Sequence, residues 1–348
     1  MTKTFYSHQC IIPPDILRNV AEKGTETQRE WAYKAIEGSS QMRGQREVMG
    51  MFAMAAAVPA GVKRRTVYDA NHKTSLPGKL VRGEGDPKSK DQSVNEAYDG
   101  AGKTYDFYSK VFDRNSIDDR GMRLDSTVHY DVEYNNAFWN GNQMVYGDGD
   151  GQIFNGFTGC LDVIAHELTH GVTQFEAGLV YKNQSGALNE SMSDVFGSLV
   201  KQYAKKQKAD KADWLIGKGL LAKGIKGVAL RSMKAPGTAY DDPLIGKDQQ
   251  PAHMKDFLKT TRDNGGVHLN SGIPNKAFYE VAIRIGGNAW EKAGRIWYIT
   301  LRDRLRPTSQ FQDCADLTLA VAKETYGATS TEAKAVQDGW DVVGIKVK

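Results

Sequence analysis

Cysteine is scarce in this chain, which contains three cysteines among its 348 residues. Cys10, Cys160 and Cys314 cannot all pair with one another, and none of them belongs to a CxxC motif. Disulfide frameworks and cysteine-ligated zinc sites both need paired or closely spaced cysteines. The sequence therefore predicts neither kind of site.

An excess of charge of one sign is also missing. The chain carries 46 basic and 42 acidic residues, which gives a formal net charge of +4 at pH 7. Proteins that bind nucleic acid usually carry a larger basic excess, so we predict no nucleic-acid partner. With 40% hydrophobic and 25% charged residues, the composition is that of an ordinary globular protein. The length suits two domains and a further fragment.

Long apolar runs are absent too. The longest, residues 51–62, is shorter than the roughly 20 residues that a membrane-spanning helix needs, and it contains Pro59 and Gly61. The first 30 residues lack the apolar core and cleavage site that mark a secretory signal. We therefore expect a soluble protein without a membrane partner, secreted without a standard signal peptide. An intracellular pool is the alternative.

Residues 1–50 differ in character from the rest of the chain. Residues 11–14, Ile-Ile-Pro-Pro, are expected to be extended, because proline disfavours helix in the residue before it. Apolar residues then recur at helical spacing over 16–20, and Thr27 with Glu30 has the spacing of a capping box before a second helix. The pattern is typical either of a short separate N-terminal unit or of an ordinary N-terminal subdomain.

The remaining chain changes from strand-like to helical patterns. Between residues 62 and 150, short β-branched runs at 65–68 and 126–130 predict strands, and 105–112 predicts a helix. Helical spacing dominates later, as in the apolar stripe that runs over 188–203. A β-rich part followed by a helical part predicts an α+β fold in two lobes.

An HExxH motif carries the chemistry of this chain. His166 and His170 are four residues apart within an apolar helical pattern, so both imidazoles lie on one helix face. Two neutral imidazoles placed in this way can bind one zinc ion, and Glu167 between them can act as a general base toward a zinc-bound water. Such a histidine pair on its own is more often a surface or core pair, and the helical context favours zinc.

A catalytic zinc site needs a third protein ligand and an open position for water. Glu190 follows His170 by 20 residues, and Asp194 shares its helix face. Two acidic residues at a helix start often only compensate the helix dipole. With the HExxH motif upstream, Glu190 is the better candidate for the third ligand. Asp194 then suits the carboxylate that accepts the N–H of a zinc-bound histidine.

Five ordered motifs resemble those of the thermolysin family of zinc endopeptidases. They are NNAFWNG at 135–141, MVYGDGDG at 144–151, HELTH at 166–170, GALNE at 186–190 and DNGGVHLNSG at 263–272. The resemblance extends from about Thr66 to the C-terminus. The short head that contains residues 11–14 is similar to the protealysin-like subgroup, whose members carry a short propeptide.

The resemblance implies a two-lobed α+β zincin fold and a role for particular residues. His166, His170 and Glu190 correspond to the zinc ligands, Glu167 to the base and Asp194 to the orienting carboxylate. The residues that correspond to the oxyanion-binding pair and the histidine's partner are Tyr181, His268 and Asp263. Those that correspond to substrate-backbone contacts are Asn136, Ala137 and Arg231. Taken alone, His268 in its glycine-rich segment would more often be a surface residue.

An apolar pocket for the residue after the cleaved bond follows from the same resemblance. The corresponding positions are all apolar here: Phe154, Phe157, Val163, Ile216 and Leu230. We therefore predict hydrolysis on the N-terminal side of bulky hydrophobic residues. Phe157 narrows the pocket relative to family members with leucine there. The alternative role of these residues, as plain core, is compatible with lining a pocket.

The sequence departs from the family at its double calcium site. Asp162 and Asp213 remain, but Lys201, Leu215 and Lys218 occupy the other acidic positions. Calcium takes oxygen ligands, and an ammonium group supplies none. We expect calcium binding there to be weak or absent, with Lys201 or Lys218 forming an ion pair with Asp162 or Asp213.

The resemblance also implies the domains and the partners. We predict an inhibitory propeptide at 1–50, a β-rich catalytic domain at 51–165 and a helical catalytic domain at 166–348. The expected product is a monomeric zymogen that acts on polypeptides and cleaves itself near 48–52. Cys10 is a small apolar residue of the propeptide or, alternatively, a thiolate that blocks the zinc.

Two other functions remain open at this stage. A zinc aminopeptidase can also use HExxH with a distant glutamate, but it needs an acidic site for the substrate's free amine. A non-catalytic zinc-binding module is the second alternative. The presence of Glu167, Tyr181 and His268 argues against that module.

Overall fold

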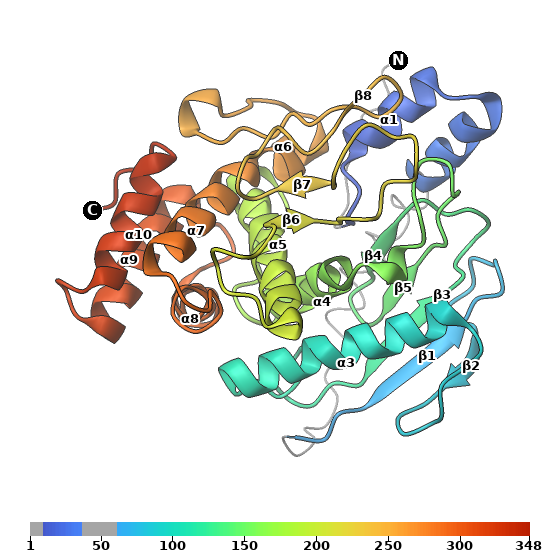
Figure 1. Cartoon of the computed structure of the whole chain (residues 1–348), viewed down its shortest axis with the longest axis horizontal. Helices are drawn as coiled ribbons and strands as arrows, with labels where there is room; N and C mark the ends of the chain where they lie inside the picture. The colour runs from blue at the N-terminus through green and yellow to red at the C-terminus, as the bar shows by residue number, and fades with distance from the viewer. Residues whose placement is uncertain (1–9, 37–60) are drawn as a thin grey trace.

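The computed structural model describes residues 10–36 and 61–348 (Figure 1). Its N-terminal lobe contains a five-stranded sheet in the order β2-β1-β3-β5-β4, in which β1, β3 and β5 are parallel. The strands are β1 (Arg65–Asp69), β2 (Lys79–Arg82), β3 (Leu124–Val128), β4 (Ala137–Trp139) and β5 (Met144–Tyr146). β1 and β3 lie where the sequence predicted strands.

Helix α3 (Gln92–Phe112) packs against this sheet and is longer than the sequence predicted. The prediction began at residue 105, but Asp91 caps the helix much earlier by accepting a hydrogen bond from the Val94 amide. Gly100 and Gly102 lie within the helix and weakened the sequence pattern there, because glycine is a poor helix former.

The α4–α5 pair lies in the middle of the molecule, between the sheet and the C-terminal helices (Figure 1). α4 (Leu161–Phe175) and α5 (Asn183–Lys205) are buried along most of their length. Gly197 lets the two helices approach, because a Cβ atom there would lie 2.7 Å from the Asp162 carbonyl oxygen. This close approach brings the acidic residues of α5 against the HExxH motif of α4.

Further helices complete the C-terminal lobe, and short strand pairs lie beside them. The α-helices are α6 (Asp263–Asn270), α7 (Gly272–Ile285), α8 (Ala293–Ile299), α9 (Phe311–Tyr326) and α10 (Thr331–Val342). The short turns of helix are η1 (Phe157–Gly159), η2 (Met254–Asp256) and η3 (Thr300–Arg304). The strand pairs are β6 (Leu215–Ile216) with β7 (Arg231–Ser232), and β8 (Asp241–Asp242) with β9 (Gly246–Lys247). The α+β fold predicted from the sequence is confirmed.

The described part of the N-terminal head contains α1 (Pro14–Lys23) and a second helix over 26–36. The predicted capping box at Thr27 and Glu30 is wrong, because the box forms two residues earlier. The Thr25 hydroxyl accepts a hydrogen bond of 3.3 Å from the Gln28 amide, and the Gln28 side chain accepts one of 3.0 Å from the Thr25 amide. The predicted self-cleavage region at 48–52 lies outside the described residues.

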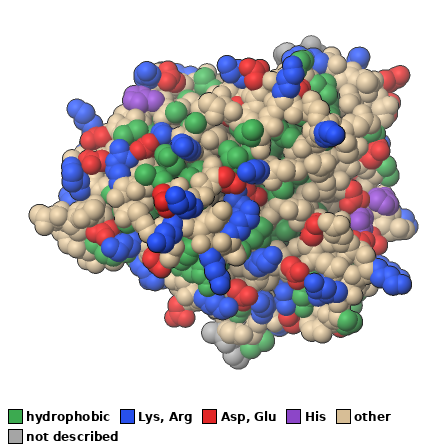
Figure 2. Space-filling view, viewed as in Figure 1, with side chains coloured by type: hydrophobic (Ala, Val, Ile, Leu, Met, Phe, Trp, Pro, Cys, Tyr) green, Lys and Arg blue, Asp and Glu red, His purple; other side chains and the backbone are tan. Residues whose placement is uncertain are grey.

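The face shown in Figure 2 carries acidic and basic side chains intermixed, as expected from the balanced charge. Among the described residues, no helix combines the length and the apolar character needed to cross a membrane.

Candidate active site

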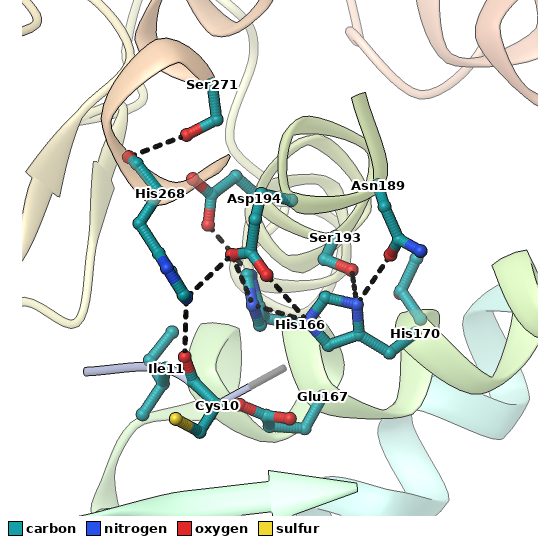
Figure 3. Close-up of polar contacts among 12 residues, drawn as sticks. Cys10, Ile11, His166, Glu167, His170, Asn189, Ser193, Asp194, His268 and Ser271 are labelled. Atoms are coloured by element: carbon teal, nitrogen blue, oxygen red, sulfur yellow. Dashed lines mark hydrogen bonds and ion pairs between the residues drawn. The ribbon is translucent and has the colours of Figure 1, made fainter. Parts of the chain in front are cut away.

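The two histidines of the HExxH motif converge inside the protein. On α4, His166 and His170 are fully buried, and their Nε2 atoms lie 3.1 Å apart. The Nδ1 atom of His166 lies 2.8 Å from Asp194 Oδ1, and that of His170 lies 2.8 Å from Asn189 Oδ1 (Figure 3). Because both oxygens are acceptors, each neutral ring carries its proton on Nδ1. Each Nε2 therefore presents a lone pair to the same point.

α5 supplies a carboxylate at this point. Glu190 is buried, with its oxygens 3.4 Å from His170 Nε2 and 3.5 Å from His166 Nε2. Its Oε1 accepts a hydrogen bond from the Tyr181 hydroxyl. Its Oε2 is buried without a hydrogen-bond partner among the residues that the structure describes, and His268 Nε2 lies 3.6 Å from it. A buried carboxylate oxygen without a donor is costly unless a cation lies beside it.

These three side chains fit a zinc ion. Two nitrogens bound to one tetrahedral zinc at about 2.0–2.1 Å are roughly 3.3 Å apart, close to the spacing of His166 and His170. The Nδ1–H groups already donate hydrogen bonds to oxygens, as is usual for histidines that ligate metals. Glu190 supplies the oxygen ligand, so the donor set matches a catalytic zinc site with three protein ligands.

Glu167 lies beside the two histidines and is also fully buried. Its Oε2 accepts a hydrogen bond of 3.0 Å from the backbone amide of Trp139 in β4. The sheet edge therefore fixes this carboxylate next to the zinc ligands, where a general base is needed.

The opposite wall comes from α6, whose start has an unusual backbone. Asn264, Gly265 and Gly266 have φ values of 51°, 89° and 77°, and this left-handed turn folds Asp263 back under His268. The Asp263 carboxylate accepts hydrogen bonds of 2.7 Å from both the amide and Nδ1 of His268. Burial alone would lower the pKa of His268, but the negative charges of Asp263 and Glu190 raise it to about 9.

Tyr181 completes this wall. Its hydroxyl lies 3.2 Å from His268 Nε2, so two donors face the same space. Burial, followed by the charge of Glu190, raises the pKa of the Tyr181 hydroxyl well above its usual value. The hydroxyl therefore stays protonated and able to donate.

Arg231 and His166 share one buried carboxylate, that of Asp194. From β7, its guanidinium donates two hydrogen bonds of 2.8 Å to Asp194, which also accepts from His166. Burial raises the pKa of Asp194, but the charge of Arg231 and the bond from His166 outweigh it and hold that pKa well below its usual range. Asp194 stays ionised and positions both side chains.

The N-terminal head lies in this site. The carbonyl of Cys10 accepts a hydrogen bond of 3.0 Å from His268 Nε2 (Figure 3). The carbonyl of Ile11 accepts one of 2.9 Å from Arg231. On the other side, Asn136 Oδ1 accepts a bond of 3.3 Å from the Ile12 amide. The amide of Ile11 donates to the Ala137 carbonyl at 3.4 Å, and Cys10 forms an antiparallel bridge with Phe138.

The predicted pocket residues are all fully buried: Phe154, Phe157, Val163, Ile216 and Leu230. Ile216 pairs with Arg231 across β6 and β7, and Leu230 precedes Arg231 in the chain. The rings of Phe154 and Phe157 contact each other with centroids 5.9 Å apart. Apolar side chains thus lie beside the arginine that binds the Ile11 carbonyl.

Sequence reasoning missed several polar residues that support this site. Asn189 and Ser193 both contact His170 Nδ1, and Asn275 donates to Asp194 at 2.9 Å. Asn189 and Ser193 lie within one turn of Glu190, so helical spacing from the proposed ligand could have found them. Asn275 comes from α7, and no local spacing connects it to the motif.

A second polar cluster lies at the other end of the same helix pair. Lys201 Nζ lies 2.9 Å from both Asp162 and Asp213 and donates to the Leu215 carbonyl at 2.5 Å. Of the two predicted ion-pair lysines, Lys201 makes the buried contact. Lys218 is exposed and lies 3.8 Å from Asp213.

Comparison with known proteins agrees with this geometry. Family models of thermolysin metallopeptidases match residues 35–174, as the catalytic domain, and residues 177–345, as the alpha-helical domain. An extracellular metalloprotease from Pectobacterium carotovorum subsp. carotovorum is 53% identical over 97% of this chain and 96% of its own length. Protease PrtS from Photorhabdus sp. (strain Az29) is 51% identical over 98% of this chain and 93% of its own.

A solved structure is similar as well. The precursor of protealysin, a metalloproteinase from Serratia proteamaculans, matches with a TM-score of 0.89 and 54% identity, covering 97% of this chain and 99% of that one. Together with the two domain models, this similarity covers both lobes and the N-terminal head. The chain belongs to the thermolysin family of metallopeptidases and is of the protealysin-like type.

Proposed function

We propose that this metallopeptidase hydrolyses peptide bonds with zinc held by His166, His170 and Glu190 and with Glu167 as general base. The observation that carries the proposal is the convergence of two imidazole Nε2 atoms, 3.1 Å apart, on the buried Glu190 carboxylate. Zinc, when bound there, acts as a Lewis acid that polarises the scissile carbonyl and acidifies a water molecule.

The side chains around this position transfer the proton, stabilise the oxyanion and position the other groups. Glu167 accepts the proton of the attacking water and delivers it to the departing amine. His268, held by Asp263, and Tyr181 donate hydrogen bonds to the oxyanion as it forms. Asp194 fixes the ring of His166 and the guanidinium of Arg231.

The position of the head supports an inhibitory propeptide. The Cys10 carbonyl contacts His268, where a scissile carbonyl belongs, and the next carbonyl contacts Arg231. Asn136 and Ala137 then bind the backbone of Ile11 and Ile12 as they would bind a substrate. The head thus occupies the proposed substrate site and excludes other peptides.

The same contacts support a preference for bulky hydrophobic residues after the cleaved bond. Ile11 is fully buried, and its carbonyl is bound by Arg231 beside Leu230 and Ile216. Phe157 reduces the space in this apolar region. We therefore expect leucine and isoleucine to be preferred over phenylalanine at that substrate position.

Localisation, calcium and domain bounds are part of this proposal. Because relatives include an extracellular metalloprotease and the precursor of protealysin, we assign the chain to an exported zymogen that acts as a monomer. The ammonium of Lys201 between Asp162 and Asp213 supports weak or absent calcium binding at that position. The domains proposed are 1–50, 51–165 and 166–348.

Hydrolysis of an internal peptide blocked at both ends tests the function. After removal of the head, the parent should cleave before leucine, lose activity with o-phenanthroline and regain it with added zinc. Glu167→Ala should lower turnover by about 10²–10⁴-fold and should keep its N-terminal head. Glu291→Gln, a change on the exposed surface, serves as the matched control and should act like the parent.

Other outcomes would contradict the proposal. Cleavage only of peptides with a free amino terminus would favour an aminopeptidase. Zinc binding without any hydrolysis by the matured chain would favour a binding module. Loss of the head by purified Glu167→Ala would show that the chain does not process itself.

A further inference from the structure

A second group of potential metal ligands lies at one edge of the N-terminal sheet. His72 follows β1, His129 directly follows β3 and Asp148 follows β5. These three strands are neighbours and parallel, so their carboxyl ends meet at the same edge. Ligand sites of parallel sheets are usually formed at this edge. None of the three residues belongs to the proposed active site.

The ligand atoms of the three side chains are close together. They all lie within 4.8 Å of one another. His129 Nδ1 lies 2.8 and 2.9 Å from the two Asp148 oxygens, and His72 Nδ1 lies 3.6 Å from Asp148 Oδ2. The His72 side chain is 54% exposed, whereas that of His129 is 18% exposed. A metal ion could therefore enter from solvent.

The loops that carry the histidines are fixed by backbone contacts. The amide of His72 donates to the His129 carbonyl at 2.9 Å. His72 and His129 both have left-handed backbones, with φ of 56° and 53°. Residues other than glycine adopt this conformation uncommonly, and it recurs at ligand-binding sites. The two rings are thereby held with their centroids 5.6 Å apart.

The second nitrogen of His129 has a carboxylate partner. Its Nε2 lies 2.8 Å from Asp91, which also caps α3. Histidines that ligate metals commonly donate their other ring N–H to a carboxylate, which fixes the tautomer and the ring. In that tautomer, Nδ1 of His129 presents its lone pair toward Asp148 and His72.

We propose that His72, His129 and Asp148 bind a divalent transition-metal ion, with Asp91 orienting His129. Two imidazoles and one carboxylate are the ligands that zinc, cobalt and nickel accept. Such an ion would join the ends of β1, β3 and β5.

Equilibrium dialysis of the full chain against zinc at pH 8 tests the proposal. The parent should bind two zinc ions, the second more weakly. His72→Ala should bind one, and because His72 is exposed its loss leaves the fold intact. Asp91→Asn keeps a capping side chain and should weaken the second ion by about 10–100-fold. His253→Ala is the control histidine change and should still bind two.

The alternative is a charged His129 that only joins two carboxylates. A parent chain that stops at one zinc, or a His72→Ala chain that still binds two, would overturn the metal site. A Co²⁺ absorption band that appears with the second equivalent in the parent, and is lost in His72→Ala, would support it. Because the active-site ligands are different residues, either result leaves the proposed peptidase function untouched.

Discussion

The α4–α5 pair carries two polar clusters that differ in the source of their positive charge. At one end, His166, His170 and Glu190 surround a position that fits a zinc ion. At the other end, Lys201 places its own ammonium between Asp162 and Asp213. Both clusters use residues on the facing sides of the same two helices, and Asp213 joins the second cluster from the segment between α5 and β6. Only the first leaves a position open to a ligand from solution.

The zinc position should matter for activity, and the fixed ammonium of Lys201 should matter for stability. A bound metal can be removed, and an exchangeable ligand position is what catalysis needs. A lysine side chain cannot dissociate, so its ion pairs persist at any calcium concentration. The zinc cluster should therefore govern turnover, and the lysine cluster should govern the free energy of unfolding.

The largest expected effect is on activity after metal removal. o-Phenanthroline should reduce peptide hydrolysis to the background rate, since His166, His170 and Glu190 alone cannot polarise a carbonyl. A calcium-specific chelator should change neither activity nor melting temperature, because Lys201 already neutralises the second cluster. Parallel activity and melting measurements check both statements. A drop in melting temperature with the calcium chelator, while zinc is retained, would show that calcium binds after all.

The next effect is on stability. Lys201→Met leaves the buried Asp162 carboxylate without its cation, and breaking such a buried pair costs about 3–5 kcal/mol. Urea unfolding measures this loss, and turnover per folded molecule should stay close to that of the parent. Lys211→Met is the matched control, because Lys211 is exposed and its ion pair within the described residues is with the exposed Asp210. Equal unfolding midpoints for the two variants would show that the buried pair contributes little.

The two clusters also differ in how far the sequence predicted them. The proposed zinc ligands His166 and His170 lie four residues apart on one helix, so the pattern itself indicated them, and the motif then made Glu190 the candidate for the third ligand. The lysine pair was predicted only as a set of alternatives, because Lys201 and Lys218 have the same chemistry in a sequence. Burial distinguishes them, and burial depends on how α5 packs against α4 at Gly197.

The rest of the fold shows the same limit. The α+β order was predicted from local periodicity, but the start of α3 was wrong because glycines interrupt its apolar pattern. The contact of Asn275 with Asp194 joins α7 to α5 across 81 residues of sequence. No pattern within one element predicts such a contact, whereas the tertiary packing of the helices determines it.

A smaller effect, on the melting temperature, is expected from converting the Lys201 cluster into a metal-binding site. Lys201→Glu places a third carboxylate beside Asp162 and Asp213, and oxygen ligands of this kind suit calcium. Calcium in the millimolar range should then raise the melting temperature by a few degrees, by about 2–4 °C per kcal/mol of binding energy. Lys201→Met is the control and should not respond. A calcium response in both variants would place the ion elsewhere.

The smallest effect is on acid stability. Burial raises the pKa of Asp213, but the charge and hydrogen bond of Lys201 outweigh this and lower it below the usual value near 3.8. A carboxyl whose pKa is lower in the folded state stabilises the fold above pH 4, and this stabilisation is lost as the pH falls through the folded pKa. The difference in unfolding midpoint between the parent and Lys201→Met should therefore narrow from pH 6 to pH 3.

Expressed as free energy of unfolding, the difference between the two proteins should narrow by less than about 1 kcal/mol. The Asp213 side chain is partly exposed to solvent, which screens the ion pair. Urea titrations of both proteins at each pH measure this difference, and the carboxylates that do not contact Lys201 cancel because both chains share them. Lys211→Met, compared with the parent in the same way, should show a constant difference. If the difference between parent and Lys201→Met instead grows toward pH 3, Lys201 does not lower the pKa of Asp213, and the second cluster is not held by its ammonium.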